Sequence, residues 1–306
     1  MKAVVLRETG GPERLEYGDV PDPDPRDGQV VVRVRAAGVN FLDVLVRQGR
    51  YPQAPPLPTI PGSEVAGEVN GRRVMALPRA DGGCYAELVA VDRELLVPLP
   101  DGASFEEGAS FLLTFLTAWI PLTRQVRVRE GSTVLVHAGA GGVGTAAIQV
   151  ARHLGARVVA IASSEEKQAL CRSLGADEAF GYDGFEERVK ADVVLDPVGG
   201  DVFTRSLATL NPLGVLVGIG FAGGWWKPLD PAPLVGRNVG VVGFYLGRLM
   251  RHRPDVVQEA IAEVVALWAS GAVRPMVGAT FPLEAAPEAH RLVEERRSTG
   301  KVVLVP

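Results

Sequence analysis

The chain has 306 residues, of which 47% are hydrophobic and 22% are charged, and its net charge at pH 7 is −4. This length is enough for two domains, each with its own core. No apolar run is long enough to span a membrane, and no polybasic cluster indicates nucleic-acid binding. Two cysteines, Cys84 and Cys171, are too few for a disulfide framework or a zinc lobe. No secretory signal is recognisable, so the sequence predicts a cytoplasmic protein.

The first hundred or so residues are predicted to be rich in β-strands. Alternating or β-branched runs predict strands near residues 30–34, 64–69, 73–76 and 85–90, with proline-rich segments between several of them. A short helix is expected around Asp43 to Gln48. This part of the chain therefore predicts a partly open barrel.

Strands and helices alternate after Ser104, which forms a capping box with Glu107 at a helix start. Strands are expected near residues 134–136, 158–161, 179–180, 193–195, 215–219 and 239–244. This alternation predicts a doubly wound parallel sheet. Helices over 254–269 and 287–296 follow, and a final strand over 301–305 would rejoin the first domain. The expected domains are residues 1–104, a nucleotide-binding domain over 105–246, and residues 247–306 as the second part of the first domain.

A glycine-rich turn joins the strand at 134–136 to a helix expected from Thr145 to Leu154. The turn contains Gly139-x-Gly141-x-x-Gly144, which permits a tight turn, backbone approach to a pyrophosphate, and close packing of helix on strand, in that order. Free N–H groups at the helix start would face the phosphates. The sequence therefore predicts a dinucleotide site at Gly139, Ala140, Gly141, Gly142, Val143 and Gly144.

The tip of the second strand of this unit indicates which dinucleotide binds. Proteins that bind NAD usually carry Asp or Glu there, to hold the ribose 2′-hydroxyl. Here the tip is Ala162-Ser163-Ser164, and Lys167 follows one turn later. Small hydroxyls and a cation suit a 2′-phosphate, so the sequence favours NADPH over NADH. A capping box of Ser163 and Glu166 would explain the same residues without a ligand, and both interpretations can hold together.

Three blocks and the tail of the chain carry a family resemblance. They are GVNFLDVLVRQGRYP with the following LPTIPGSEVAGEV, HAGAGGVGTAAIQVARHLGA, DVVLDPVGG, and the terminal STGKVVLVP. Together they resemble the medium-chain dehydrogenase/reductase superfamily, and specifically its zinc-free quinone oxidoreductases related to zeta-crystallin. The resemblance implies an α/β fold in which a doubly wound parallel Rossmann sheet is inserted in a β-rich, partly open, GroES-like catalytic domain. It also implies a homodimer formed by edge strands near residues 239–244.

Two positions distinguish the chain from zinc-dependent members of that superfamily. Those enzymes carry a catalytic Cys where Asn40 stands and a His where Ser63 stands, before a Glu that matches Glu64. Zinc sites use thiolate, imidazole and carboxylate, so the sequence predicts no bound metal. Without a Lewis acid, the chemistry that fits is hydride delivery to an acceptor that is already electrophilic, such as a quinone or an α,β-unsaturated carbonyl.

The resemblance also assigns catalytic candidates. Asn40 and Tyr51 match positions beside the nicotinamide and the substrate, and Thr117 matches a threonine that approaches the nicotinamide carboxamide. Ordering of a turn, packing under the proline loop and a bond to an i−4 carbonyl would explain these three residues without a ligand. Asp43 either orients its neighbours or occupies a helix N-terminus, and Glu64 is expected to be structural.

The remaining candidates are expected around the cofactor. Tyr182 follows Lys167 by the spacing that the family uses to flank the 2′-phosphate, so Ser163, Ser164, Lys167 and Tyr182 form the expected 2′-phosphate site. Gly218, Gly220 and Phe244 are expected near the nicotinamide, and Arg297 and Lys301 are weaker candidates.

The predicted function is that of an NADPH-dependent quinone oxidoreductase acting on a small molecule, with no nucleic-acid or membrane partner. An enal/enone or enoyl-thioester reductase is the alternative enzyme. A non-catalytic, crystallin-like NADPH-binding protein is the alternative of another class.

Overall fold

The computed structural model describes residues 1–78 and 83–306 of the chain. It divides into two compact units, Met1–Leu113 with Pro275–Pro306, and Thr114–Arg274. The second unit is thus an insertion in the first. Its end differs from the expected residue 246, because α9 (Leu246–His252) and α10 (Pro254–Ala269) belong to it. The Glu263 carboxylate of α10 accepts from Trp119 Nε1 at 2.6 Å and from Arg124 Nη2 at 2.7 Å.

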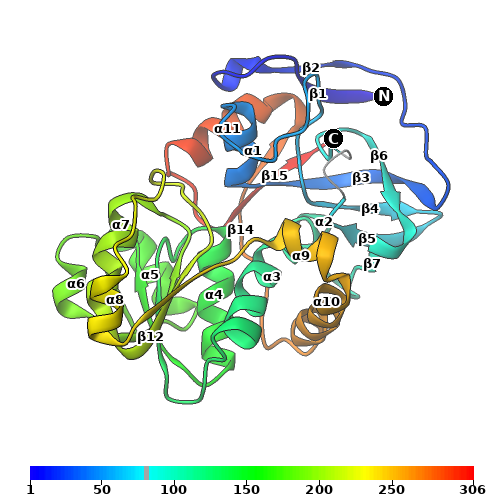
Figure 1. Ribbon diagram of the computed structural model, residues 1–306. Coiled ribbons are helices and arrows are strands. Elements are labelled where there is room, and N and C mark those ends of the chain that lie inside the picture. Colours follow the sequence, from blue (N-terminus) through cyan, green and yellow to red (C-terminus); the bar gives the residue numbers. More distant parts are fainter. Residues whose placement is uncertain (79–82) are drawn as a thin grey trace. The chain divides into compact units, whose positions relative to one another are not determined.

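The second unit contains a six-stranded parallel sheet in the order β10-β9-β8-β11-β12-β13. Its strand β12 is labelled in Figure 1. The strands are β8 (Thr133–Val136), β9 (Arg157–Ile161), β10 (Glu178–Phe180), β11 (Ala191–Asp196), β12 (Leu210–Gly218) and β13 (Gly240–Gly243). From β8 the chain continues through β9 to β10 at one edge of the sheet, and from β11 through β12 to β13 at the other edge. Because the connections run in opposite directions, right-handed crossovers place helices on both faces. The expected doubly wound Rossmann sheet is confirmed.

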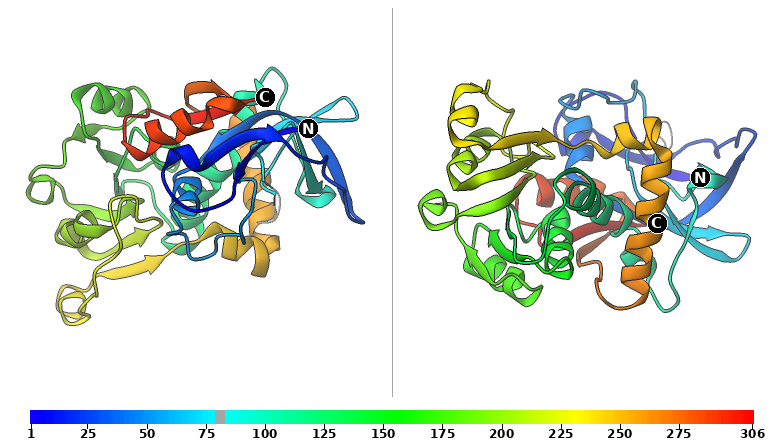
Figure 2. Two further views of the ribbon diagram at one scale, coloured as in Figure 1. Left: turned by 90° about the horizontal axis from the view of Figure 1, so that it is seen from above. Right: turned by 60° about the horizontal axis from the view of Figure 1, so that its bottom comes forward.

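Helices connect these strands and complete the second unit. They are α3 (Leu112–Ile120) with its π-helical continuation (Pro121–Gln125), α4 (Gly142–His153), α5 (Glu165–Ser173), α6 (Phe185–Arg188), α7 (Gly200–Ser206) and α8 (Ala232–Arg237), besides α9 and the sixteen-residue α10, drawn in orange in Figure 2. The central strands are buried on both faces, which explains their short β-branched runs: Val134, Val136, Val158 and Val194 are fully buried.

The first unit contains a seven-stranded sheet and a separate β1–β2 hairpin. Its strands are β1 (Lys2–Leu6), β2 (Leu15–Asp19), β3 (Gln29–Val39), β4 (Val65–Val69), β5 (Arg72–Ala76), β6 (Leu88–Asp92), β7 (Val97–Pro98), β14 (Val277–Pro282) and β15 (Lys301–Val305). The eleven-residue β3 organises the sheet, because it pairs with β6 and then β15 along one edge and with β4 along the other. The C-terminal β15 therefore joins β3, as expected (Figure 1).

The described residues of the first unit form the helices α1 (Phe41–Arg47), α2 (Phe105–Gly108) and α11 (Ala286–Glu294), with 3-10 turns at Pro12–Arg14, Arg93–Leu95 and Leu283–Ala285. The capping box of Ser104 and Glu107 at the start of α2 is confirmed. No helix within residues 1–78 and 83–306 is both long and apolar enough to cross a bilayer.

Three local expectations need correction. The cap of α5 is Ser164, whose hydroxyl accepts from Lys167 N at 3.3 Å, so the expected capping box of Ser163 and Glu166 is wrong by one residue. The helix α4 begins at Gly142, inside the glycine turn, rather than at Thr145. The strand expected at 85–90 begins at Leu88, because Tyr85 O accepts from Val4 N and Tyr85 N donates to Pro61 O instead of joining the sheet ladder.

Candidate functional site

One edge of the sheet in the second unit collects every residue predicted to bind the cofactor. In a parallel sheet all carboxyl ends lie at the same edge, and loops there form the usual ligand site. The glycine turn follows β8, Ser163 and Ser164 follow β9, and Tyr182 follows β10. At the other end of the sheet, Gly218 closes β12 and Phe244 follows β13, where Phe244 N donates to Gly218 O at 2.9 Å.

The glycine turn is held by backbone hydrogen bonds from both central strands. His137 N donates to Leu195 O of β11 at 3.1 Å, and Gly139 N donates to Ile161 O of β9 at 2.9 Å. The left-handed conformation in the turn falls on Ala138, at φ +49°, and not on Gly139. Gly139 is required for space instead, because a Cβ there would lie 2.8 Å from the Cys171 sulfur.

The start of α4 is an open cradle of backbone donors. Its N-cap is Gly141, and the first bond inside the helix runs from Thr145 N to Gly141 O. The N–H groups of the first turn precede that bond and carry the positive end of the helix dipole. A Cβ on Gly141 would meet Ala138 O at 3.3 Å, whereas one on Gly144 would lie 2.1 Å from that oxygen. Gly144 is therefore fixed by packing, while Gly141 leaves open the face that a phosphate needs.

The candidates for the 2′-phosphate lie beyond β9 and β10. Ser163 and Ser164 are exposed, and the Lys167 side chain is half-buried, which lowers the pKa of its ammonium. Tyr182 has a structural bond as well, because its hydroxyl accepts from Ala138 N at 3.1 Å, and its ring stacks on His137. Burial lowers the pKa of His137 to about 3, so this ring is neutral and packs in the core, as expected.

The turn after β11 was missed by sequence reasoning. Asp196 is fully buried, and its carboxylate accepts from Val198 N at 2.8 Å and Gly199 N at 3.2 Å. Burial raises the pKa of this carboxyl to about 6. Gly199 then bridges to Gly224, in the loop that carries the exposed Trp225. The DPVGG segment was the available signal, and strands β8 and β11 meet where the strand order reverses, which is where such sheets bind ligands.

A buried ion pair lies beside Asn40 in the first unit. Lys301 Nζ lies 3.0 Å from Glu64 Oε2, and the two side chains are 4% and 0% exposed. The same ammonium donates to Asn40 Oδ1 at 2.6 Å, and Glu64 Oε1 accepts from Leu113 N at 2.9 Å. Lys301 is therefore a side-chain partner of Asn40 in the first unit, which the sequence reasoning did not find.

A second buried network holds the backbone of Asn40. Asp43 Oδ2 accepts from Asn40 N at 2.8 Å and from the Tyr85 hydroxyl at 3.1 Å, and Oδ1 accepts from the Ser63 hydroxyl at 3.0 Å. The Tyr85 hydroxyl also contacts His290 Nε2 at 3.1 Å. Burial raises the pKa of Asp43 to about 6 and lowers that of His290 to about 3. Asp43 thus orients Asn40 and also occupies the first turn of α1, so both interpretations of this residue apply.

The other two catalytic candidates lie on different units. Tyr51 is partly buried and packs against the core of the first unit. Thr117 lies on α3 in the second unit and is half-buried. Their proposed roles toward a ligand stay predictions.

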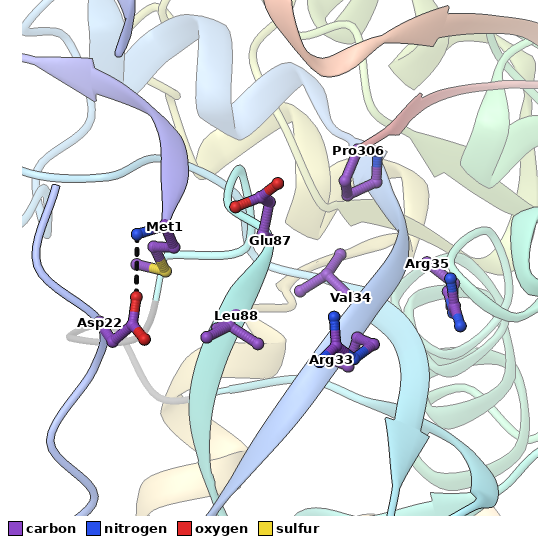
Figure 3. A pocket seen from close by; sticks show the side chains of 8 residues that line it. All are labelled: Met1, Asp22, Arg33, Val34, Arg35, Glu87, Leu88 and Pro306. Atoms are coloured by element: carbon purple, nitrogen blue, oxygen red, sulfur yellow. Dashed lines mark hydrogen bonds and ion pairs between the residues drawn. The ribbon is translucent and has the colours of Figure 1, made fainter. Parts of the chain in front are cut away.

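Two further features bear on ligand binding. Within residues 1–78 and 83–306, no group of three or more His, Cys, Asp or Glu side chains could hold a metal ion. A surface hollow of about 510 Å³ in the first unit includes Arg33, Arg35, Asp22 and Glu87 in its lining, and the Met1 amino group pairs with Asp22 (Figure 3). Its lining carries charges of both signs and none of the predicted site residues, so it does not indicate a ligand.

Known proteins match the whole chain. Residues 26–101 match the alcohol dehydrogenase GroES-like domain family, and residues 174–304 match the zinc-binding dehydrogenase family. The chain is 37% identical to a quinone oxidoreductase of Pseudomonas aeruginosa, covering 100% of this chain and 99% of the relative. Structures of the quinone oxidoreductases of Thermus thermophilus (45% identity) and Escherichia coli (29% identity) each match with a TM-score of 0.92 over 100% of both chains, and both were described with NADPH.

Proposed function

Because the chain belongs to the zinc-free quinone oxidoreductase family of the medium-chain dehydrogenase/reductases, we propose that it reduces quinones with NADPH as the hydride donor. The observation that carries this proposal is the glycine cradle at the start of α4, next to a β9 tip without an acidic residue. We assign the second unit as the NADPH-binding domain and the first unit as the catalytic domain.

The residues of the cradle fit a dinucleotide. The N–H groups of Gly142, Val143 and Gly144 would bind the pyrophosphate, and Gly141 would leave it room. Ser163, Lys167 and the nearby Tyr182 would bind the 2′-phosphate, since hydroxyls and an ammonium suit a dianion. Gly218, Gly220 and Phe244 would contact the nicotinamide half by backbone and ring. When bound, NADPH supplies a hydride from its nicotinamide ring.

The protein's part in the chemistry is to position the acceptor and stabilise the charge that develops on it. A quinone that receives a hydride becomes an oxyanion, and hydrogen-bond donors in a dry site lower the energy of that state. Asn40 offers an amide N–H for this task, and Tyr51 is a further polar candidate. Thr117 would approach the carboxamide of the nicotinamide. Proton uptake from water then completes the hydroquinone, so no metal is required in this scheme.

A kinetic panel tests the proposal. Purified protein is given NADPH or NADH with benzoquinones, naphthoquinones, alkenals, enones and an enoyl-CoA, and nicotinamide oxidation is followed at 340 nm. We expect the highest kcat/KM with NADPH and a quinone. A preference for an enone or enoyl-CoA would reassign the acceptor, and tight NADPH binding without turnover on any acceptor would indicate a non-catalytic binding protein.

We also propose a homodimer that pairs through β13. This strand is last in the sheet order and pairs with β12 alone among the described strands, so its other edge can accept a second copy. Leu213 and Val235 are 84% and 77% exposed, and Leu213 N bonds Asn238 O just before β13. The double variant Leu213→Glu/Val235→Glu should be monomeric by light scattering, while Tyr17→Glu, an exposed apolar site of the first unit, should stay dimeric. A dimeric double variant would argue against this interface.

The cytoplasm is the compartment we propose. Its support is that Cys84 and Cys171 are both buried thiols, and burial raises the pKa of the Cys171 thiol to about 11. Titration of denatured protein from the native host, without reductant, should find both thiols.

A further inference from the structure

The side-chain oxygen of Asn40 is held by a buried cation. Lys301 Nζ donates to Asn40 Oδ1 at 2.6 Å, and the Lys301 side chain is 4% exposed. Burying an ammonium is costly unless it is paired and hydrogen-bonded. Glu64 provides the paired charge at 3.0 Å and is itself fully buried. The fold therefore keeps the Lys301 ammonium beside the side-chain amide of Asn40.

The sheet register explains why these residues meet. Val302 pairs with Val39, so the same antiparallel register places Lys301 opposite Asn40 one position beyond the ladder. On the other edge of β3, Gly38 N donates to Glu64 O at 3.0 Å. A Cβ on Gly38 would lie 3.0 Å from Glu64 Oε2 and 3.1 Å from Lys301 Nζ. The ion pair thus lies over the bare backbone of Gly38, which leaves it room.

The ammonium also determines which way the amide faces. An ammonium can only donate, so the Asn40 atom that faces it must be the oxygen. The nitrogen is then the donor end of the amide, and its bond to Gly38 O is long, at 3.4 Å. A charge-assisted bond at the oxygen draws electron density from the amide and makes its N–H groups better donors. Lys301 therefore does two things: it fixes the orientation of Asn40 and polarises it.

We propose that Lys301 is a positioning residue for the reaction, which presents and polarises the Asn40 Nδ2 group as the hydrogen-bond donor to the acceptor oxygen, with Glu64 balancing its charge. The inference rests on the proposed hydride transfer, because it gives Asn40 a task only where an oxyanion develops. In zinc-dependent relatives the resemblance places metal ligands at positions 40 and 63 beside Glu64. In this chain the cation next to that carboxylate is the side chain of Lys301.

The test distinguishes the effect of the Lys301 ammonium on kcat from an effect on the stability of the fold. Lys301→Met or Glu64→Gln alone would leave one buried charge unpaired, so the comparison is between wild type and Glu64→Gln/Lys301→Met. The double variant removes the ammonium from Asn40 without leaving an unpaired charge. Loss of one oxyanion donor costs about 100- to 1000-fold in kcat. We expect kcat of Glu64→Gln/Lys301→Met to fall about ten- to a hundredfold relative to wild type, with the NADPH Kd within about twofold.

A mutant cycle distinguishes positioning from general stabilisation. If Lys301 acts through Asn40, then adding Glu64→Gln/Lys301→Met to Asn40→Ala should change kcat less than about twofold beyond Asn40→Ala alone. The matched control is Arg47→Met, which removes another fully buried cation of the first unit, one that bonds Glu294 and Gly10 O. It should lower thermal stability and leave kcat of the folded enzyme near wild type. Equal kcat losses in the presence and absence of Asn40 would overturn the proposal.

A spectroscopic readout does not depend on turnover. The Asn40 side-chain ¹H–¹⁵N signals, assigned by their disappearance in Asn40→Ala, should lie downfield in wild type and move upfield in Glu64→Gln/Lys301→Met. If no quinone is reduced by wild type but the signals move as stated, the proposed function fails and the polarised amide stands. If wild type is active and neither kcat nor the signals change on removal of the ammonium, the inference is wrong and the proposed function stands.

Discussion

Three glycine-to-alanine variants test whether a pyrophosphate lies at the start of α4, because the added methyl group meets different surroundings in each. On Gly144 it would overlap backbone, with Ala138 O at 2.1 Å and Gly139 Cα at 2.7 Å. Backbone cannot move aside as a flexible side chain can, so Gly144→Ala should lose about 2–3 kcal/mol of unfolding free energy, a fall in Tm of about 4–12 °C.

Gly141→Ala should separate binding from folding. Its nearest protein atom would be Ala138 O at 3.3 Å, and the φ of Gly141 is −82°, which alanine adopts without strain. We expect a stability change below about 1 kcal/mol. The methyl group would occupy the space of the bound phosphate, and we expect NADPH binding about 10- to 100-fold weaker, or about 1.4–2.7 kcal/mol.

The assay is NADPH titration by calorimetry beside urea unfolding of each variant. Gly236→Ala on α8 is the matched control, because a Cβ there meets nothing within 4 Å. It should bind NADPH normally and be slightly more stable, as alanine is in a helix. Wild-type affinity in Gly141→Ala would refute the assignment of the cradle to the pyrophosphate.

Three further predictions concern the other sites. Lys167→Glu should raise the KM for NADPH at least about tenfold and leave that for NADH within about threefold, measured under the same quinone concentration. Gly38→Ala should destabilise the first unit by at least about 2 kcal/mol in urea unfolding, because its Cβ would lie 2.1 Å from Ala109 O. As the pH rises from about 4 to 6, stability should gain from His290, whose pKa falls to about 3, and lose from Asp43, whose pKa rises to about 6. His290→Gln removes the gain that His290 contributes, so the unfolding free energy of this variant relative to wild type should fall as the pH rises over this range.

The fold could be predicted from the sequence because its evidence is local. Short β-branched runs buried on both faces, such as Val134–Val136, alternate with helices, and this pattern alone indicates the parallel sheet. The glycine turn is local as well, since all its parts lie within eight residues. Where the structure differs from the expectation, neighbouring residues explain the difference. Ser164 rather than Ser163 caps α5, and hydrogen bonds from Trp119 and Arg124 to Glu263 attach α10 to the second unit.

The environment of Asn40 could not be predicted in the same way. Lys301 lies 261 residues from Asn40 in sequence, and Glu64 lies 237 residues from Lys301. Only the pairing of β15 with β3 and of β3 with β4 brings them together, and no periodic pattern encodes that register. The sequence nevertheless held one clue. A lysine that opens an otherwise apolar strand, Lys301 before Val302 to Val305, must find a partner if the strand is buried.

The two buried networks, around Asp43 and around Lys301, hold different atoms of Asn40. Asp43 holds the backbone N–H of Asn40, so it fixes where the side chain begins, whereas Lys301 holds the amide oxygen and fixes where the donor points. An amide held at both ends loses little entropy when it meets an acceptor, which is the advantage of a preorganised donor over a mobile one. A donor of this kind needs no metal to hold it in place, because the register of three strands does so.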